Sequence, residues 1–207
     1  MSRLRRKIDQ YLIDWKNNPN KMPLIVKGAR QIGKTESIMH FAKSNYENIV
    51  EINFALDKQY LNIFDDGFDV DTIIKNISFI NPNFKFVPGK TLIFFDELQA
   101  CINCATSLKA FNLDGRFDII CSGSLMGINY NEIESNSVGN KIDYDMYSMD
   151  FEEFLWAKGY SEEQIEDLYK HMEITKPLNT SQYEAMMNNF RDYMIVGGMP
   201  AIVNEFY

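Results

Sequence analysis

The stretch GARQIGKT, from Gly28 to Thr35, decides the fold because it fits the pattern G-x-x-x-x-G-K-[ST]. Glycines at both ends let the backbone curl so that successive N–H groups face one anion, and a helix beginning near Lys34 adds the positive end of its dipole. Lys34 would reach the β- and γ-phosphates of a nucleotide, and the Thr35 hydroxyl would take one position around Mg²⁺. The residues expected to bind ATP phosphates are Gly28, Ala29, Arg30, Gln31, Ile32, Gly33, Lys34, Thr35 and Glu36.

The alternative for this stretch is a strand-loop-helix turn that contains two glycines by coincidence. From average composition, a match of the four fixed positions in a chain this long arises by chance about 1 time in 100. The flanking sequence also fits, since the apolar run 22–27 (MPLIVK) predicts a buried strand and residues 35–43 predict a helix. The phosphate-binding interpretation is therefore favoured.

A second signal follows the apolar strand predicted over residues 91–95 (TLIFF), where Asp96 and Glu97 stand side by side. Two carboxylates at the end of a buried strand are costly unless they have partners or a function. We expect Asp96 to hold Mg²⁺, directly or through water, and Glu97 to orient and deprotonate the attacking water. The alternative is a pair of acids that caps the next helix.

Strands and helices alternate through the first 150 residues, which predicts a three-layer αβα fold with a mainly parallel sheet. Ser122 and Ser124 follow the next strand along the chain, so either could contact the γ-phosphate or the water as a sensor; a turn of small residues explains them equally well. The predicted strands cover 22–27, 49–54, 91–95 and 117–121, and the predicted helices of this part cover 2–16, 35–43 and 70–80.

The pattern changes near Asp150, and helices are predicted over 151–158, 161–172 and 181–194, with another beginning at Pro200. We therefore expect a nucleotide domain over 1–150, led by the helix 2–16, and a helical appendage over 151–207. Gly197-Gly198 is interpreted as a tight turn into the last helix. Because the chain stops in an apolar helix at Tyr207, we expect it to be truncated before a further domain.

Composition narrows the class of protein further. The 207 residues are 45% hydrophobic and carry a net charge of −8, which suits a folded chain and argues against a nucleic-acid binder held by bulk charge. A local contact with nucleic acid through Arg3, Arg5, Arg6 and Lys7 is possible but has no other support, since four such charges on one helix face are more often only solvated. No apolar run is long enough for a membrane span, and three cysteines suit a reducing compartment, so a soluble cytoplasmic protein is expected. Cys101 and Cys104 have zinc-like spacing, but buried thiols are favoured.

At these residues the chain resembles the AAA-type ATPases, and within them a prokaryotic group of ATP-binding proteins with an uncharacterised C-terminal domain. The resemblance covers nearly the whole chain. Five stretches carry it: 26–37 (VKGARQIGKTES), 91–100 (TLIFFDELQA), 120–128 (ICSGSLMGI), 146–159 (MYSMDFEEFLWAKG) and 193–203 (YMIVGGMPAIV). The last two of these stretches single out this group.

The resemblance implies a central sheet with strand order 5-1-4-3-2. It also implies Lys34 and Thr35 on the phosphates and Mg²⁺, Asp96 on Mg²⁺, Glu97 as the catalytic base, and a sensor at Ser122–Ser124. The expected function is Mg-dependent ATP binding and hydrolysis, coupled to a conformational change that a partner reads. The alternative is a non-hydrolytic ATP-binding switch or scaffold.

The sequence assigns no arginine finger, the residue that neutralises transition-state charge in many nucleotide hydrolases. Arg116 precedes the sensor strand, and Arg191 lies in the helical appendage. Because one well-placed arginine is worth roughly 10³–10⁵ in rate, hydrolysis by this chain alone is expected to be slow, unless self-association or a protein partner supplies the arginine.

Overall fold

The structure is a computed structural model that describes residues 3–124, 139–173 and 177–207. Residues 125–128 of the family-like stretch 120–128 lie outside the described residues. By packing, the chain divides into two compact units: a sheet unit, Tyr11–Met146, and a helical unit, Met1–Gln10 with Tyr147–Tyr207. The division falls slightly before the expected boundary at Asp150, and it groups the first ten residues with the C-terminal helices.

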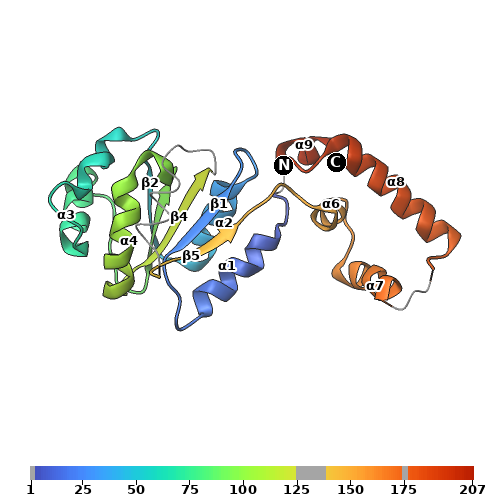
Figure 1. The fold of residues 1–207 in the computed structure, drawn as a ribbon, viewed down its shortest axis with the longest axis horizontal. Helices are drawn as coiled ribbons and strands as arrows, with labels where there is room; N and C mark the ends of the chain where they lie inside the picture. The colour runs from blue at the N-terminus through green and yellow to red at the C-terminus, as the bar shows by residue number, and fades with distance from the viewer. Residues whose placement is uncertain (1–2, 125–138, 174–176) are drawn as a thin grey trace. The chain divides into compact units, whose positions relative to one another are not determined.

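The sheet unit is built on five parallel strands in the order β2-β3-β4-β1-β5 (Figure 1). From the other edge this is 5-1-4-3-2, so the three-layer α/β fold and its strand order are confirmed. Parallel strands place all their carboxyl ends at one edge of the sheet, where ligands bind in open α/β folds. The strands are β1 (Leu24–Gly28), β2 (Asn48–Asn53), β3 (Thr91–Asp96), β4 (Asp118–Ser124) and β5 (Ile142–Asp145).

Both faces of the sheet are buried because its strands alternate two sets of apolar side chains. One set, exemplified by Ile25 and Phe95, joins a large core with α3 and α4. The other set, exemplified by Val26 and Phe94, is equally buried on the opposite face, which α1 and α2 cover (Figure 1). The helices of this unit are α1 (Lys7–Asn17, which continues into the helical unit), α2 (Lys34–Asn45), α3 (Val70–Ile80) and α4 (Ile102–Asp114), with short 3-10 turns at Lys58–Phe64 and Leu98–Ala100.

Three features of the elements differ from expectation. Helix α1 begins at Lys7 rather than residue 2. Helix α4 was not predicted because part of its buried face is made of Cys104, Ser107 and other small residues instead of a regular apolar stripe. Strand β5, sequence IDYD, alternates half-buried and exposed residues and is too short and acidic to be read as a strand.

The helical unit contains α6 (Phe151–Ala157), α7 (Glu162–Glu173), α8 (Thr180–Val196) and α9 (Pro200–Phe206). Capping boxes fix where two of these helices begin: Asp150 with Glu153 at α6, and Asn179 with Gln182 at α8. A small core of Met149, Phe154 and Val203 packs against further apolar residues of the same unit. Among the described residues, no helix combines the length and the apolar character needed to cross a membrane.

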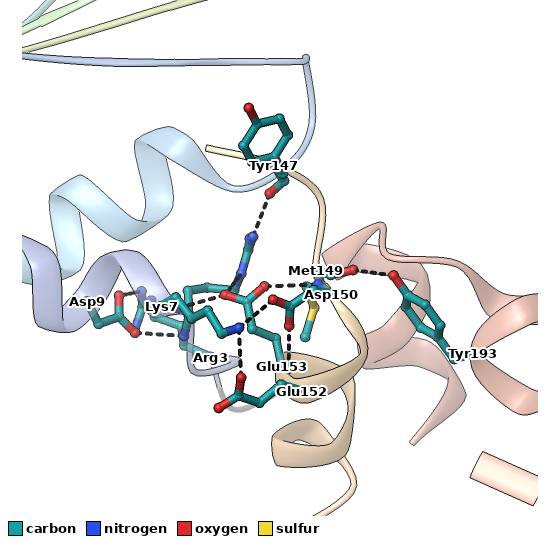
Figure 2. A network of polar contacts seen from close by, with 10 residues as sticks. Arg3, Lys7, Asp9, Tyr147, Met149, Asp150, Glu152, Glu153 and Tyr193 are labelled. Carbon is teal, nitrogen blue, oxygen red and sulfur yellow. Dashed lines mark hydrogen bonds and ion pairs between the residues drawn. The ribbon is translucent and has the colours of Figure 1, made fainter. Parts of the chain in front are cut away.

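The first residues of the chain are bound to this unit by charge. The Nζ of Lys7 lies 2.5 Å from Asp150 Oδ2 and 2.7 Å from Glu152 Oε2. Figure 2 shows Lys7 between these two carboxylates. Beside it, the Nε of Arg6 donates to Glu153 Oε1 at 3.0 Å, and both side chains are only 5% exposed. Glu153 therefore serves twice, as the capping residue of α6 and as the partner of a buried arginine.

The two stretches that single out the family-like group meet inside the helical unit. The N–H of Met149 donates to the carbonyl of Gly198 at 2.8 Å. The hydroxyl of Tyr193 donates to the carbonyl of Met149 at 2.9 Å (Figure 2). A Cβ on Gly198 would lie 2.2 Å from that Met149 carbonyl oxygen. The Gly197-Gly198 pair is therefore more than a turn, because its second glycine lets two backbones touch.

Candidate nucleotide site

The loop between β1 and α2 has the backbone conformation that an anion cradle requires. Gly33, the residue before α2, is left-handed with φ of 89°, and Gln31 is also left-handed with φ of 63° although it carries a side chain. Alternation of left- and right-handed residues turns successive N–H groups toward one point. At the start of the loop, a Cβ on Gly28 would lie 2.2 Å from the carbonyl oxygen of Met146, so only glycine fits there.

Lys34 is buried in the loop and its ammonium group is held by backbone. The Nζ donates to the carbonyls of Gly28 at 3.0 Å and Ala29 at 2.5 Å. Burial lowers the pKa of Lys34, while the nearby charges of Glu97 and Asp96 oppose that shift. The ammonium group of Lys34 is therefore a partly desolvated cation whose contacts at this point are two carbonyls of its own loop.

Asp96, at the carboxyl end of β3, collects hydrogen bonds from four directions. Its Oδ2 accepts from the hydroxyl of Thr35 at 3.1 Å and from Nδ2 of Asn53 at 3.0 Å. Its Oδ1 accepts from the hydroxyl of Ser122 and from the N–H of Glu97 at 3.0 Å. Asp96 is only 4% exposed, so burial removes most of the water that would hydrogen-bond to its carboxylate. The four donors take the place of that water.

Glu97 follows in a left-handed conformation, with φ of 57° and ψ of 48°. Such a backbone is uncommon for a residue with a side chain and costs roughly 1–3 kcal/mol. The side-chain amide of Gln99 donates to Glu97 Oε2, while Gln99 Oε1 accepts from the N–H of Ser124 at 3.2 Å. Gln99 therefore links Glu97 to the end of β4.

The structure brings together most of the residues singled out from the sequence. Thr35, Asp96 and Ser122 are in direct contact, and Lys34 lies close enough to Asp96 and Glu97 for their charges to act on it. The side chain of Ser122 is directed at Asp96, and Ser124 contributes its backbone to Gln99. Arg30, Gln31 and Glu36 are exposed along the loop and the first turn of α2. The sensor roles of Ser122 and Ser124 stay predictions.

Two residues of this cluster were missed from the sequence, Asn53 and Gln99. Asn53 ends β2 and pairs with Asp96 of β3, so knowledge of the register between these two strands would have placed it there. Gln99 stands two residues after Glu97 in a 3-10 turn, where its polar side chain carried no recognisable pattern.

The arginines considered as fingers have other contacts. Arg116 donates to Asp114 and Asp71, and these ion pairs raise the pKa of its guanidinium. Arg191 donates to Asn188 of its own helix at 3.1 Å. The arginine-finger position therefore stays unassigned.

The three cysteines are buried free thiols, as favoured from the sequence. Burial raises the pKa of Cys101 to about 11 and that of Cys104 well above its usual range. Across the described ranges of the chain, no three His, Cys, Asp or Glu side chains are grouped to hold a metal ion.

Comparison with known protein families shows which family the chain belongs to. Residues 20–155, which contain the whole sheet, the loop and the acidic strand, match the family described as AAA domain. The chain belongs to this family. Membership supports nucleotide binding by the AAA domain.

Relatives of this AAA domain are distant. The uncharacterized protein MJ1544 of Methanocaldococcus jannaschii is 25% identical over 191 residues, a match that spans 92% of this chain and 38% of that protein. Among solved structures, PCH-2 of C. elegans has a TM-score of 0.44 at 13% identity, over 84% of this chain and 49% of the other. The Aeropyrum pernix ORC1 protein, solved in complex with DNA, has a TM-score of 0.46 at 9% identity, over 72% and 46%.

Proposed function

We propose that the chain binds Mg-ATP and hydrolyses it to ADP and phosphate, and that this cycle changes a conformation that a partner reads. The observation that carries the proposal is the contact between Thr35 Oγ1 and Asp96 Oδ2 at 3.1 Å. It joins the first turn after the phosphate loop to the acidic end of β3. Phosphate-binding and metal-binding groups are thereby within one hydrogen bond of each other.

The loop residues would hold the triphosphate. In the structure, Lys34 donates to two carbonyls of the loop, and phosphate oxygens would take their place. The N–H groups of residues 29–36 and the N-terminal end of α2 would contribute the remaining donors. Catalysis in such a site consists of positioning and of neutralising charge on the transferred phosphoryl group.

The donors present fit Mg²⁺, which prefers oxygen ligands and retains several waters. Thr35 and Asp96 would hold it, with the amide of Asn53 and the hydroxyl of Ser122 orienting the carboxylate. When bound, the ion would neutralise charge on the β- and γ-phosphates. Glu97 would accept a proton from the attacking water.

A second function, a switch that binds ATP without turnover, is favoured by one observation. The Glu97 carboxylate already accepts a hydrogen bond from Gln99 at Oε2, so one of the two oxygens that could contact water is held by a side chain. In this case nucleotide would order the site and a partner would read the ordered form.

Phosphate release from Mg-ATP by wild type and by Glu97→Gln separates the two functions, with binding confirmed in the same samples. Loss of the base is expected to lower turnover by about 10²–10⁴ while binding persists. Glu47→Gln, an exposed acid paired with Lys90 on the surface, is the matched control and should behave as wild type. Binding without turnover in the wild-type protein would favour the switch, and equal turnover in all three proteins would overturn the role of Glu97.

A further inference from the structure

The end of the chain exposes more large apolar side chains than its length accounts for. Seven of the fifteen exposed large hydrophobic residues found in the described chain lie within residues 180–207. Four of them stand on α8, where Tyr183 is 56% exposed, Phe190 43%, Met194 69% and Ile195 84%. Gathered apolar surface of this kind marks an interaction site more often than isolated exposed residues do.

The apolar residues of α8 form a stripe along one face of the helix. Tyr183, Met187, Phe190 and Met194 are separated by four, three and four residues, the spacing by which helices pair side by side. Met187 is half-buried and completes the stripe. This series reads the same in both directions from its midpoint between Asn188 and Asn189.

That mirror symmetry points to a particular partner. If a second α8 lies antiparallel across the first, Tyr183 meets Met194 and Met187 meets Phe190, each contact occurring twice about a twofold axis. A parallel arrangement would instead stack each residue on its own copy.

Charges beside the stripe agree with the antiparallel arrangement. Glu184 and Arg191 are both exposed and each follows a stripe residue, Tyr183 and Phe190 respectively. Positions of this kind face each other across an antiparallel pair, so Glu184 of one copy lies opposite Arg191 of the other, twice. Arg191 also donates to Asn188 at 3.1 Å, which holds its guanidinium on this flank of the helix.

We propose that α8 is a self-association surface on which a second copy of this chain binds, with the two helices antiparallel. Tyr183–Met194, Met187–Phe190 and Glu184–Arg191 are the contacts across the axis. The proposal is independent of whether the sheet unit hydrolyses ATP, because none of these residues belongs to the nucleotide site.

Sedimentation equilibrium of the 207-residue chain over a range of concentrations, with and without a charge exchange, tests this surface. Wild type should be a concentration-dependent dimer. Glu184→Arg or Arg191→Glu alone should weaken the dimer about tenfold, since two attractive pairs become repulsive, and the double exchange should restore it. Met194→Glu should leave a monomer. A monomeric wild type, or a double exchange as weak as the single ones, would overturn the proposal.

Crosslinking determines the direction of the helices. In Tyr183→Cys/Met194→Cys, the two new thiols of one chain lie about 16 Å apart along the helix and cannot bridge each other. An antiparallel pair joins Cys of one copy to Cys of the other, so oxidation should give covalent dimers from the double variant and not from either single variant. Dimers from the single variants would show a parallel pair and contradict the proposal. The native thiols are buried and should not interfere.

Discussion

At the scale of single residues, Gly28 places the phosphate loop against the sheet. Its absent side chain leaves room for the carbonyl of Met146, whose own N–H donates to Lys27 at 2.7 Å. A Cβ at this position would push on the backbone directly after β5, which is hydrogen-bonded to Lys27 of β1. The loop therefore tolerates no other residue at its start.

Gly28→Ala should destabilise the protein by about 3 kcal/mol or more, because the Met146 carbonyl must move. Gly89→Ala is the matched control: Gly89 is also at positive φ, 70°, but no heavy atom lies within 4 Å of the added Cβ. It should cost only about 1 kcal/mol from the backbone conformation. Urea unfolding of both variants measures the difference, and equal losses would contradict the steric argument.

The native thiols should be almost unreactive at pH 8. With a pKa of about 11, Cys101 has about one thiolate in a thousand at that pH, and Cys104 and Cys121 are fully buried. Alkylation should therefore be slow in the folded protein and should modify all three cysteines once the protein is unfolded. The raised pKa also means that burial of Cys101 stabilises the fold below pH 9 and that this contribution is lost as pH rises toward 11. Rapid labelling of the folded protein would contradict this account.

The sequence predicted part of the cluster of polar residues around Asp96 and missed the rest for a physical reason. Thr35 and Asp96 belong to patterns typical of phosphate- and metal-binding sites, so both were singled out from the sequence. Asn53 and Gln99 act only through geometry: one by register between β2 and β3, the other by a bond to the end of β4. Neither constraint leaves a trace in local sequence.

At the scale of elements, α6 depends on the segment before α1. Glu153 Oε1 accepts from Arg6 Nε at 3.0 Å and from the N–H of Lys7 at 2.7 Å, and its Oε2 accepts from the N–H of Asp150 at 3.2 Å. The pair is buried, and a buried charge that loses its partner is strongly destabilising. The first residues of the chain are therefore part of the helical unit.

Glu153→Ala should destabilise the helical unit by about 3–5 kcal/mol, since Arg6 is left buried without this carboxylate. Glu166→Ala removes an exposed carboxylate whose oxygen lies 3.9 Å from Lys170 on α7, and should cost about 0.3 kcal/mol. Thermal unfolding followed by circular dichroism compares the two variants. A loss below 1 kcal/mol for Glu153→Ala would show that the Arg6 pair does not hold the segment.

Elements with regular patterns were predicted closely, and the others were not. Residues 70–80 form α3 at the predicted bounds because its apolar side chains recur at helical spacing. The helix over 102–114 and the strand over 142–145 were missed because small or charged residues fill positions that packing makes structural. Tertiary context overrides local preference at such positions.

At the scale of the whole molecule, two units share one helix. Residues 7–10 of α1 pack in the helical unit and residues 11–17 in the sheet unit. This sharing was not expected, since the leading helix was assigned wholly to the nucleotide domain. The interactions responsible join residues far apart in sequence, such as Arg6 with Glu153, which are 147 residues apart, and no local pattern reveals them.

The central claim is that the loop from Gly28 to Thr35 binds the phosphates of ATP, and calorimetric titration with Mg-ATP tests it most directly. Wild type should bind, and Lys34→Ala should bind about 10–100-fold more weakly, because charge-assisted hydrogen bonds to phosphate are lost. Lys43→Ala, an exposed lysine in the last turn of the same helix, should bind as wild type. Equal affinity of Lys34→Ala and wild type, or no binding by wild type, would contradict the claim.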